Sequence, residues 1–95
     1  MPGIHLLGML DSGHGCFPPR PNVQASPNVN VEGRAVHRRG DLWAPHKCGP
    51  NVHASVLAKG SVTVFVNGKG CGRIGDPVAC GSVTIDGART VFAGG

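Results

Sequence analysis

The sequence contains an internal repeat that aligns without a gap. Residues 26–41 (SPNVNVEGRAVHRRGD) match residues 61–76 (SVTVFVNGKGCGRIGD) at an offset of 35 residues. The identical positions include the first serine, two alternating valines, a central glycine, an arginine and the final Gly-Asp pair. A third, truncated copy begins at Ala88, where ARTVFAGG resembles SVTVFVNG. Because one short unit cannot bury its own apolar face, the copies must pack against one another.

Each copy has the pattern of a β-hairpin. Val62, Val64 and Val66 recur at every second position, which is typical of a half-buried strand. Asn67–Gly68 follows them, and this dipeptide favours the type I′ turn, in which both central residues have positive φ. Glu32–Gly33 occupies the same place in the first copy. The repeat therefore predicts successive hairpins joined by loops.

Composition favours an all-β chain with a thin core. Of the 95 residues, 16 are glycine and 8 are proline, which disfavours helices. Aromatic residues make up only 4% of the chain, so the core must be built from valine, alanine and leucine. A small domain with such a core usually needs a disulfide, a metal or a partner for stability.

These patterns predict that residues 1–95 form a single domain of repeated β-hairpins with pseudo-three-fold symmetry. An N-terminal strand at Ile4–Leu7 is expected to complete the arrangement. The hairpin turns would form a flat base, and the metal-stapled apex would lie at the opposite end. Three connecting loops are expected to converge at that apex: residues 11–25, 42–60 and 77–87.

The three loops carry potential metal ligands at repeat-related positions. His53 and Cys80 each lie eight residues before the start of the next copy, so they occupy one structural position. His14 lies twelve residues before its copy, with a proline-rich insert between, and His46 comes from the other limb of the second loop. Three histidines and one cysteine make the four ligands that a closed structural zinc site needs.

Other assignments of the cysteines stay open at this point. Cys16 follows His14 by two residues and Cys48 follows His46 by two, so either cysteine is an alternative ligand. One such alternative set of ligands is His46, Cys48, His53 and Cys80. Cys16 and Cys48 can also form a disulfide, which is disfavoured in the cytoplasm, where a chain without a recognisable signal peptide is made.

Three further residues have simpler interpretations. His5 and His37 fall on predicted strands and are expected to be exposed or hydrogen-bonded. Cys71 lies within a return strand and is expected to be a small buried thiol.

Several functions are disfavoured. Asp41 and Asp76 are repeat-equivalent, which marks them as turn residues rather than an acid–base pair, and no HExxH motif is present. We therefore expect that the chain is not an enzyme, that it has no catalytic residues and that it acts on no small-molecule substrate. The net charge of +4 permits a small zinc-dependent nucleic-acid-binding domain, but too few aromatics are available for base stacking. No stretch is long and apolar enough to span a membrane.

Three segments resemble the PAAR-repeat proteins, which form the sharp tip of contractile injection machines. They are GSVTVFVNGKGCGRIGDPVACGS (60–82), SPNVNVEGRAVHRRGDLW (26–43) and DSGHGCFPPRPN (11–22), and the likeness extends from about Gly3 to Gly95. The Pro-Ala-Ala-Arg tetrapeptide is reduced here to AVHR (35–38) and GCGR (70–73), in which only the arginine is retained. Met9 stands where an aspartate following Gly8 would be expected.

The resemblance implies a cone with a zinc ion near its point, held by three histidines and one cysteine. Carried over by position, these ligands are His14, His46, His53 and Cys80. Iron is the alternative metal at such a site. The flat base would dock on a trimeric β-helical spike, and the tip would pierce the target outer membrane transiently. The short chain and the HGCFPPRP insert favour the tail tip of a phage virion over the alternative, a type VI secretion spike tip capping a VgrG-like trimer.

Overall fold

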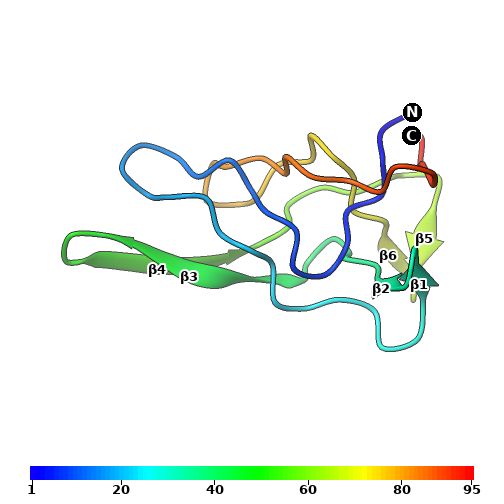
Figure 1. Cartoon of the computed structure of the whole chain (residues 1–95), viewed down its shortest axis with the longest axis horizontal. Coiled ribbons are helices and arrows are strands. Elements are labelled where there is room, and N and C mark those ends of the chain that lie inside the picture. Colours follow the sequence, from blue (N-terminus) through cyan, green and yellow to red (C-terminus); the bar gives the residue numbers. More distant parts are fainter.

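The chain folds into three separate two-stranded antiparallel hairpins and contains no helix, so the predicted all-β class is confirmed. The computed structural model describes residues 1–95 and measures 38 × 24 × 21 Å. The six strands are β1 (Asn30–Val31), β2 (Arg34–Ala35), β3 (Leu42–Cys48), β4 (Asn51–Val56), β5 (Phe65–Val66) and β6 (Lys69–Gly70). The β3–β4 hairpin reaches one end of the molecule, while the two shorter hairpins and both termini lie at the other (Figure 1). No helix is available that would cross a membrane.

The two repeat hairpins turn where the sequence predicts. Glu32 and Gly33 have φ values of 52° and 78°, and Asn67 and Gly68 have values of 55° and 76°. Both central residues of each turn are therefore left-handed, as a type I′ turn requires. The strands are shorter than the valine pattern predicts. In the second copy, the Ser61 hydroxyl accepts the backbone N–H groups of Thr63 and Val64, which bends the chain before β5.

Two predicted elements are wrong in detail. The segment 42–60, expected to be a loop, contains the longest strands, β3 and β4. Trp43 and His46 are the buried residues of β3 and lie three positions apart, because the register shifts between them. This irregularity accommodates Pro45, which has no N–H to donate. Ile4–Leu7 forms only isolated bridges instead of a strand, because Ile4 pairs with one repeat and Leu6 with the other.

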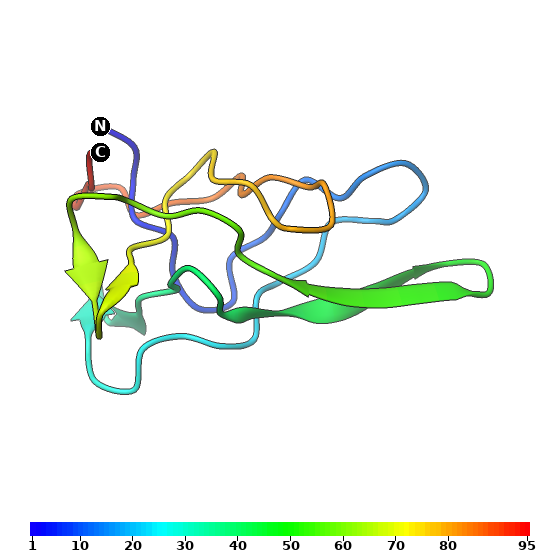
Figure 2. The same ribbon diagram turned by 180° about the vertical axis from the view of Figure 1, so that it is seen from behind.

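A ring of backbone hydrogen bonds establishes the pseudo-three-fold arrangement. The N–H of His5 donates to the Gly72 carbonyl at 2.8 Å, that of His37 to His5 at 3.0 Å, and that of Gly72 to His37 at 2.9 Å. A side chain at Gly72 would collide with the His37 carbonyl, so this side of the ring admits only glycine. The three connecting segments run from the hairpin end toward a common opposite end (Figure 2).

The two ends of the chain together make the third unit. Val36 bonds to the Val29 carbonyl in the first copy, and Cys71 bonds to Val64 in the second. The matching bond in the third unit joins Ile4, near the N-terminus, to Val91, near the C-terminus. The truncated repeat seen in the sequence is thus completed by residues from the other end of the chain.

Each unit contains the same tight turn. In the first copy the Asp41 N–H donates to the Arg38 carbonyl at 2.9 Å, and Gly40 between them has a φ of 88°. The Asp41 carboxylate accepts the Arg38 backbone N–H and two guanidinium N–H groups at 2.8–2.9 Å. Arg73 and Asp76 repeat these contacts in the second copy. The prediction that both aspartates are turn residues is confirmed.

The third unit replaces this ion pair with an apolar pair. Met9 donates its N–H to the Leu6 carbonyl at 3.1 Å, across a glycine, Gly8, with a φ of 83°. The Met9 sulfur accepts the Leu6 N–H at 3.3 Å, in the place where the other units use a carboxylate oxygen. Met9 therefore occupies the position of the aspartates in the other two units, where the family resemblance leads us to expect an aspartate.

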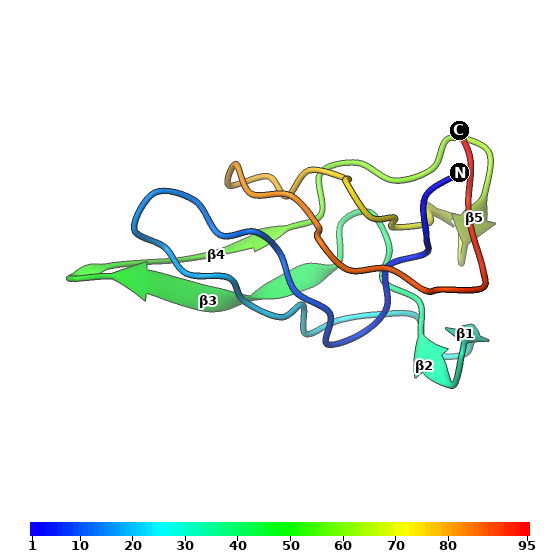
Figure 3. The ribbon, with the colours of Figure 1, turned by 45° about the horizontal axis from the view of Figure 1, so that its top comes forward.

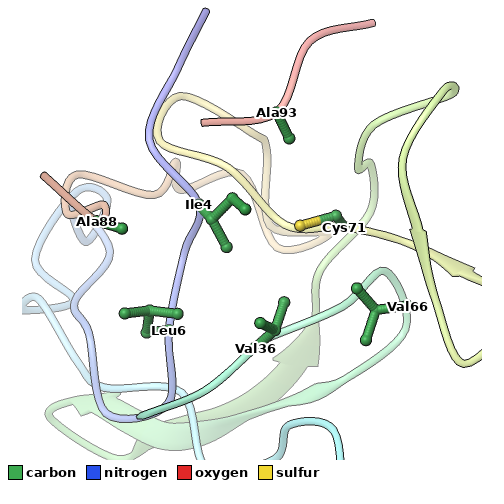
Figure 4. Close-up of a cluster of buried hydrophobic side chains, with 7 residues drawn as sticks. All are labelled: Ile4, Leu6, Val36, Val66, Cys71, Ala88 and Ala93. Carbon is green, nitrogen blue, oxygen red and sulfur yellow. The ribbon is translucent and has the colours of Figure 1, made fainter. Parts of the chain in front are cut away.

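The core is small and surrounds the axis of the pseudo-three-fold symmetry. Its main cluster includes the equivalent residues Ile4, Val36 and Cys71, which lie together in Figure 4. The other members of that cluster are Leu6, Val66, Ala88 and Ala93. A second cluster, Trp43, Leu57 and Val78, comes from the apex segments 42–60 and 77–87, and Cys80 packs against it. Cys71 is fully buried and free, as predicted.

His5 and His37 are fully buried, so exposure of either histidine is ruled out. Both rings pack on Trp43, with ring centroids 5.1 and 5.2 Å from the indole. Their Nδ1–H groups donate to the carbonyls of Asp86 and Gln24, whereas neither Nε2 atom has a partner. Burial lowers the pKa of both imidazoles, and that of His37 falls to about 4.

We expect stability to fall as the pH is lowered from about 6.5 toward 4. The pKa of folded His37 lies below that of the unfolded chain, so protonation in this window favours unfolding by up to roughly 3 kcal/mol. Urea unfolding of chelator-treated protein at pH 7 and pH 4.5 measures the effect. His37→Asn keeps a donor near the Nδ1 position and should show a weaker pH dependence. Equal pH dependence in the two proteins would show that His37 does not contribute.

Candidate metal centre

Four side chains meet at the apex. The ligand atoms of His14, His46, His53 and Cys80 all lie within 4.8 Å of one another. The Nε2 atom of His53 is 3.1 Å from that of His14 and 2.7 Å from that of His46. The structure thus brings together the four residues that the sequence singles out, and their role as metal ligands remains a prediction.

Each ligand candidate is placed by local structure. His46 and His53 are directly paired across the β3–β4 hairpin, which puts both side chains on one face. His14 lies in a tight turn closed by mutual backbone hydrogen bonds with Phe17. Cys80 lies in the turn after Val78. Three loops far apart in the sequence therefore each contribute to the cluster.

The Nε2 atoms of the three histidines face the centre of the cluster. His46 donates its Nδ1–H to the Pro18 carbonyl at 2.9 Å, which leaves the Nε2 lone pair facing the cluster. Desolvation and the neighbouring His46, His14 and Arg20 charges lower the pKa of His53, so its ring is neutral at pH 7. Neutral imidazoles are the form that binds metals.

The thiol of Cys80 is biased toward thiolate. Burial raises its pKa, but hydrogen bonds with Ser82 and the charge of Arg20 outweigh this and bring the pKa below its ordinary value. The Ser82 hydroxyl lies 3.6 Å from the sulfur. Three imidazoles and one thiolate, with no carboxylate among them, form a donor set that suits zinc.

Cys16 and Cys48 form a disulfide, so the alternative disfavoured on sequence grounds is the one observed. Their Cα atoms are 5.5 Å apart, and the bond joins the His14 loop to the end of β3. Neither sulfur is then free to act as a ligand, and the alternative set containing Cys48 does not assemble. Pairing of β3 with the return limb of the first loop, through the Asn22–Trp43 bridge and the bond from the Ala44 N–H to the Pro21 carbonyl, brings Cys48 beside Cys16, which spacing alone does not reveal.

Sequence reasoning missed Arg20, which lies at the centre of the apex. The residue is buried and contacts both Asp11 and Cys80. Its only sequence signal is a lone charge between two prolines, in the segment Pro19-Arg20-Pro21. That signal does not distinguish a buried arginine with several hydrogen-bond partners from an exposed loop residue.

Comparison with known proteins gives a family match and two related proteins. Residues 18–86 match the family described as the PAAR motif. The chain is 32% identical over 81 residues to the NAD(P)(+) glycohydrolase toxin Tse6 of Pseudomonas aeruginosa. It shows the same identity over the same length to the (p)ppApp synthetase toxin Tas1, from another strain of that species. Each match covers 77% of this chain and 18% of the relative, so the chain spans about a fifth of the relatives' length.

Proposed function

The chain belongs to the PAAR motif family of spike-tip proteins, and on that premise we propose that it caps a type VI secretion spike and carries one zinc ion at its apex. PAAR domains are structural tips of contractile injection systems, and they cap trimeric spike proteins. The observation that carries the proposal is the pseudo-three-fold ring through His5, His37 and Gly72. Such symmetry lets one chain present three equivalent units to a three-fold partner.

The end of the molecule opposite the apex supports docking of this kind. Val29 and Val64, directly before β1 and β5, and Val91, near the C-terminus, are repeat-equivalent. Their exposed fractions are nearly equal, at 36%, 38% and 37%. The end that carries β1, β5 and both termini is visible in Figure 3. We define Val29, Val64 and Val91 as the base triad, an apolar surface with the symmetry of a trimeric β-helical spike.

A change in the base triad tests the docking. Val64→Glu is expected to abolish co-purification with the trimeric spike protein from the same source, because it places a charge in an apolar contact. Val52→Glu is the matched control, since Val52 is an exposed valine in β4 of the apex hairpin. Normal circular dichroism of both variants would establish that they fold. Equal binding of the two variants would contradict docking through the base triad.

The apex cluster would act as a cross-link. We propose that His14, His46, His53 and Cys80 hold a single zinc ion, with iron as the alternative metal. A bound ion would join the three apex loops and so stiffen a tip that has only a small core. In this proposal residues 1–95 work as one mechanical unit without catalysis. The tip crosses the target outer membrane only transiently, and no nucleic acid or small-molecule substrate is involved.

The choice of machine is revised from the sequence-based prediction. Shortness and the proline-rich insert favoured a phage tail baseplate, whereas the two matched relatives are named as toxins of a bacterium. That naming favours a bacterial secretion apparatus as the setting, with the phage tail as the alternative. Locating the tagged chain in sheath preparations from the producing bacterium, or in purified virions, would distinguish the two.

A further inference from the structure

We propose that Arg20 is the positioning residue of the apex metal centre, and that its guanidinium holds the Cys80 sulfur at the metal by a charge-assisted hydrogen bond. The inference rests on the proposed metal site. The Nη2 atom of Arg20 donates to the Cys80 sulfur at 2.9 Å. A cationic donor makes a charge-assisted hydrogen bond, which is shorter and stronger than a neutral one and therefore fixes the position of the sulfur.

Arg20 contacts all three apex loops. It is only 3% exposed, and it lies on the return limb of the first loop. Its Nη1 atom donates to the Ala44 carbonyl in β3 at 3.0 Å and to the His53 carbonyl in β4 at 3.5 Å. The side chain therefore contacts two of the four candidate ligand residues, Cys80 through its sulfur and His53 through its backbone.

The guanidinium is held in place by Asp11. This fully buried carboxylate accepts the Arg20 backbone N–H and Nε–H, both at 3.0 Å. It also accepts the Gly13 N–H at 3.1 Å and the Ser82 hydroxyl at 2.7 Å. The indole of Trp43 lies 5.9 Å from the guanidinium carbon and adds a cation–π contact. Asp11, Ala44 and His53 thus engage the Nε–H and Nη1–H groups, and the Nη2 nitrogen is directed at Cys80.

This arrangement has the form of an outer-sphere contact. Residues that hydrogen-bond to metal ligands fix their orientation and tune the metal, and their loss typically costs 10- to 100-fold in affinity. The N–H···S bond also stabilises the sulfur lone pair, so it raises the energy of charge transfer from sulfur to a bound cobalt ion. A residue that only supported the fold would not change that energy.

The test uses the full chain loaded with zinc or cobalt. Arg20→Lys keeps the charge but loses the forked geometry, and it is expected to bind zinc roughly 10- to 100-fold more weakly in chelator competition. Its sulfur-to-cobalt band should move to lower energy. The double variant Asp11→Leu/Arg20→Met removes both partners, so no buried charge is left unpaired, and the same two changes are expected.

The matched control is Arg38→Met/Asp41→Leu, which removes another buried Arg–Asp pair of the same chain. It should leave zinc affinity and the cobalt band as in the wild type. Wild-type affinity and an unchanged band in both Arg20 variants would overturn the role of Arg20 alone. A wild-type chain that binds no metal would overturn the proposed metal centre, and with it this inference.

Discussion

Replacing His53 with alanine is expected to release the metal and to cost the protein much of its stability. The Nε2 atom of His53 lies 2.7 Å from that of His46 and 3.1 Å from that of His14. Its loss would therefore remove one of the four ligands from the centre of the cluster. A 1,000-fold weaker binding of the metal by the folded state lowers the free energy of unfolding by about 4 kcal/mol. For a chain of this size that is a fall in Tm of roughly 15–30 °C. The effect is large because few apolar side chains are buried.

Metal content by mass spectrometry, together with Tm, measures this effect and identifies the ion as zinc or iron. Cys80→Ala should behave like His53→Ala. Two controls should retain one equivalent of metal: Cys71→Ala, which removes the buried thiol outside the cluster, and Cys16→Ser/Cys48→Ser, which removes the disulfide. Full metal in His53→Ala and Cys80→Ala would place the site elsewhere. Metal loss in the Cys16/Cys48 variant would return those sulfurs to the ligand set.

Asp41→Met is expected to destabilise the fold by about 3–5 kcal/mol, because it leaves the Arg38 guanidinium buried without its counter-charge. The same replacement also removes an acceptor for the Arg38 backbone N–H. Urea unfolding at pH 7 measures the loss. The third unit of this protein already shows which pair can replace the salt bridge, since Leu6 and Met9 occupy the equivalent positions.

The double variant Arg38→Leu/Asp41→Met copies the pair of the third unit into the first. Because it removes both buried charges, we expect it to cost less than about 2 kcal/mol and to be more stable than Asp41→Met alone. The contacts of Arg38 with the Asn67 side chain and the Ala25 carbonyl are lost, which accounts for the remaining cost. A double variant as unstable as the single one would show that the ion pair has a role beyond charge balance.

Local backbone preferences made several parts of this protein readable from sequence. Asn67–Gly68 and Glu32–Gly33 specify left-handed turns wherever the rest of the chain lies. The repeat then equates positions in successive units, and counting from it selected the residues that meet at the apex. The family resemblance, not the repeat, supplied the expectation of an aspartate at Met9, and the shared turn geometry accounts for it.

Packing between distant segments decided the rest. Which histidines and cysteines meet depends on how three loops lie against one another, and a spacing of two residues fits a ligand or a disulfide equally well. Pairing of β3 with the first loop decided between these two roles for Cys16 and Cys48.

The sequence also could not predict which polar side chains are buried or what they contact. Trp43 packs on the buried rings of His5 and His37, and Asp11 supplies the buried counter-charge of Arg20. The sequence by itself determined turns and equivalences, which depend on local φ and spacing. Only the tertiary structure decided burial and contact, which depend on chain segments as far apart as the two ends of the chain.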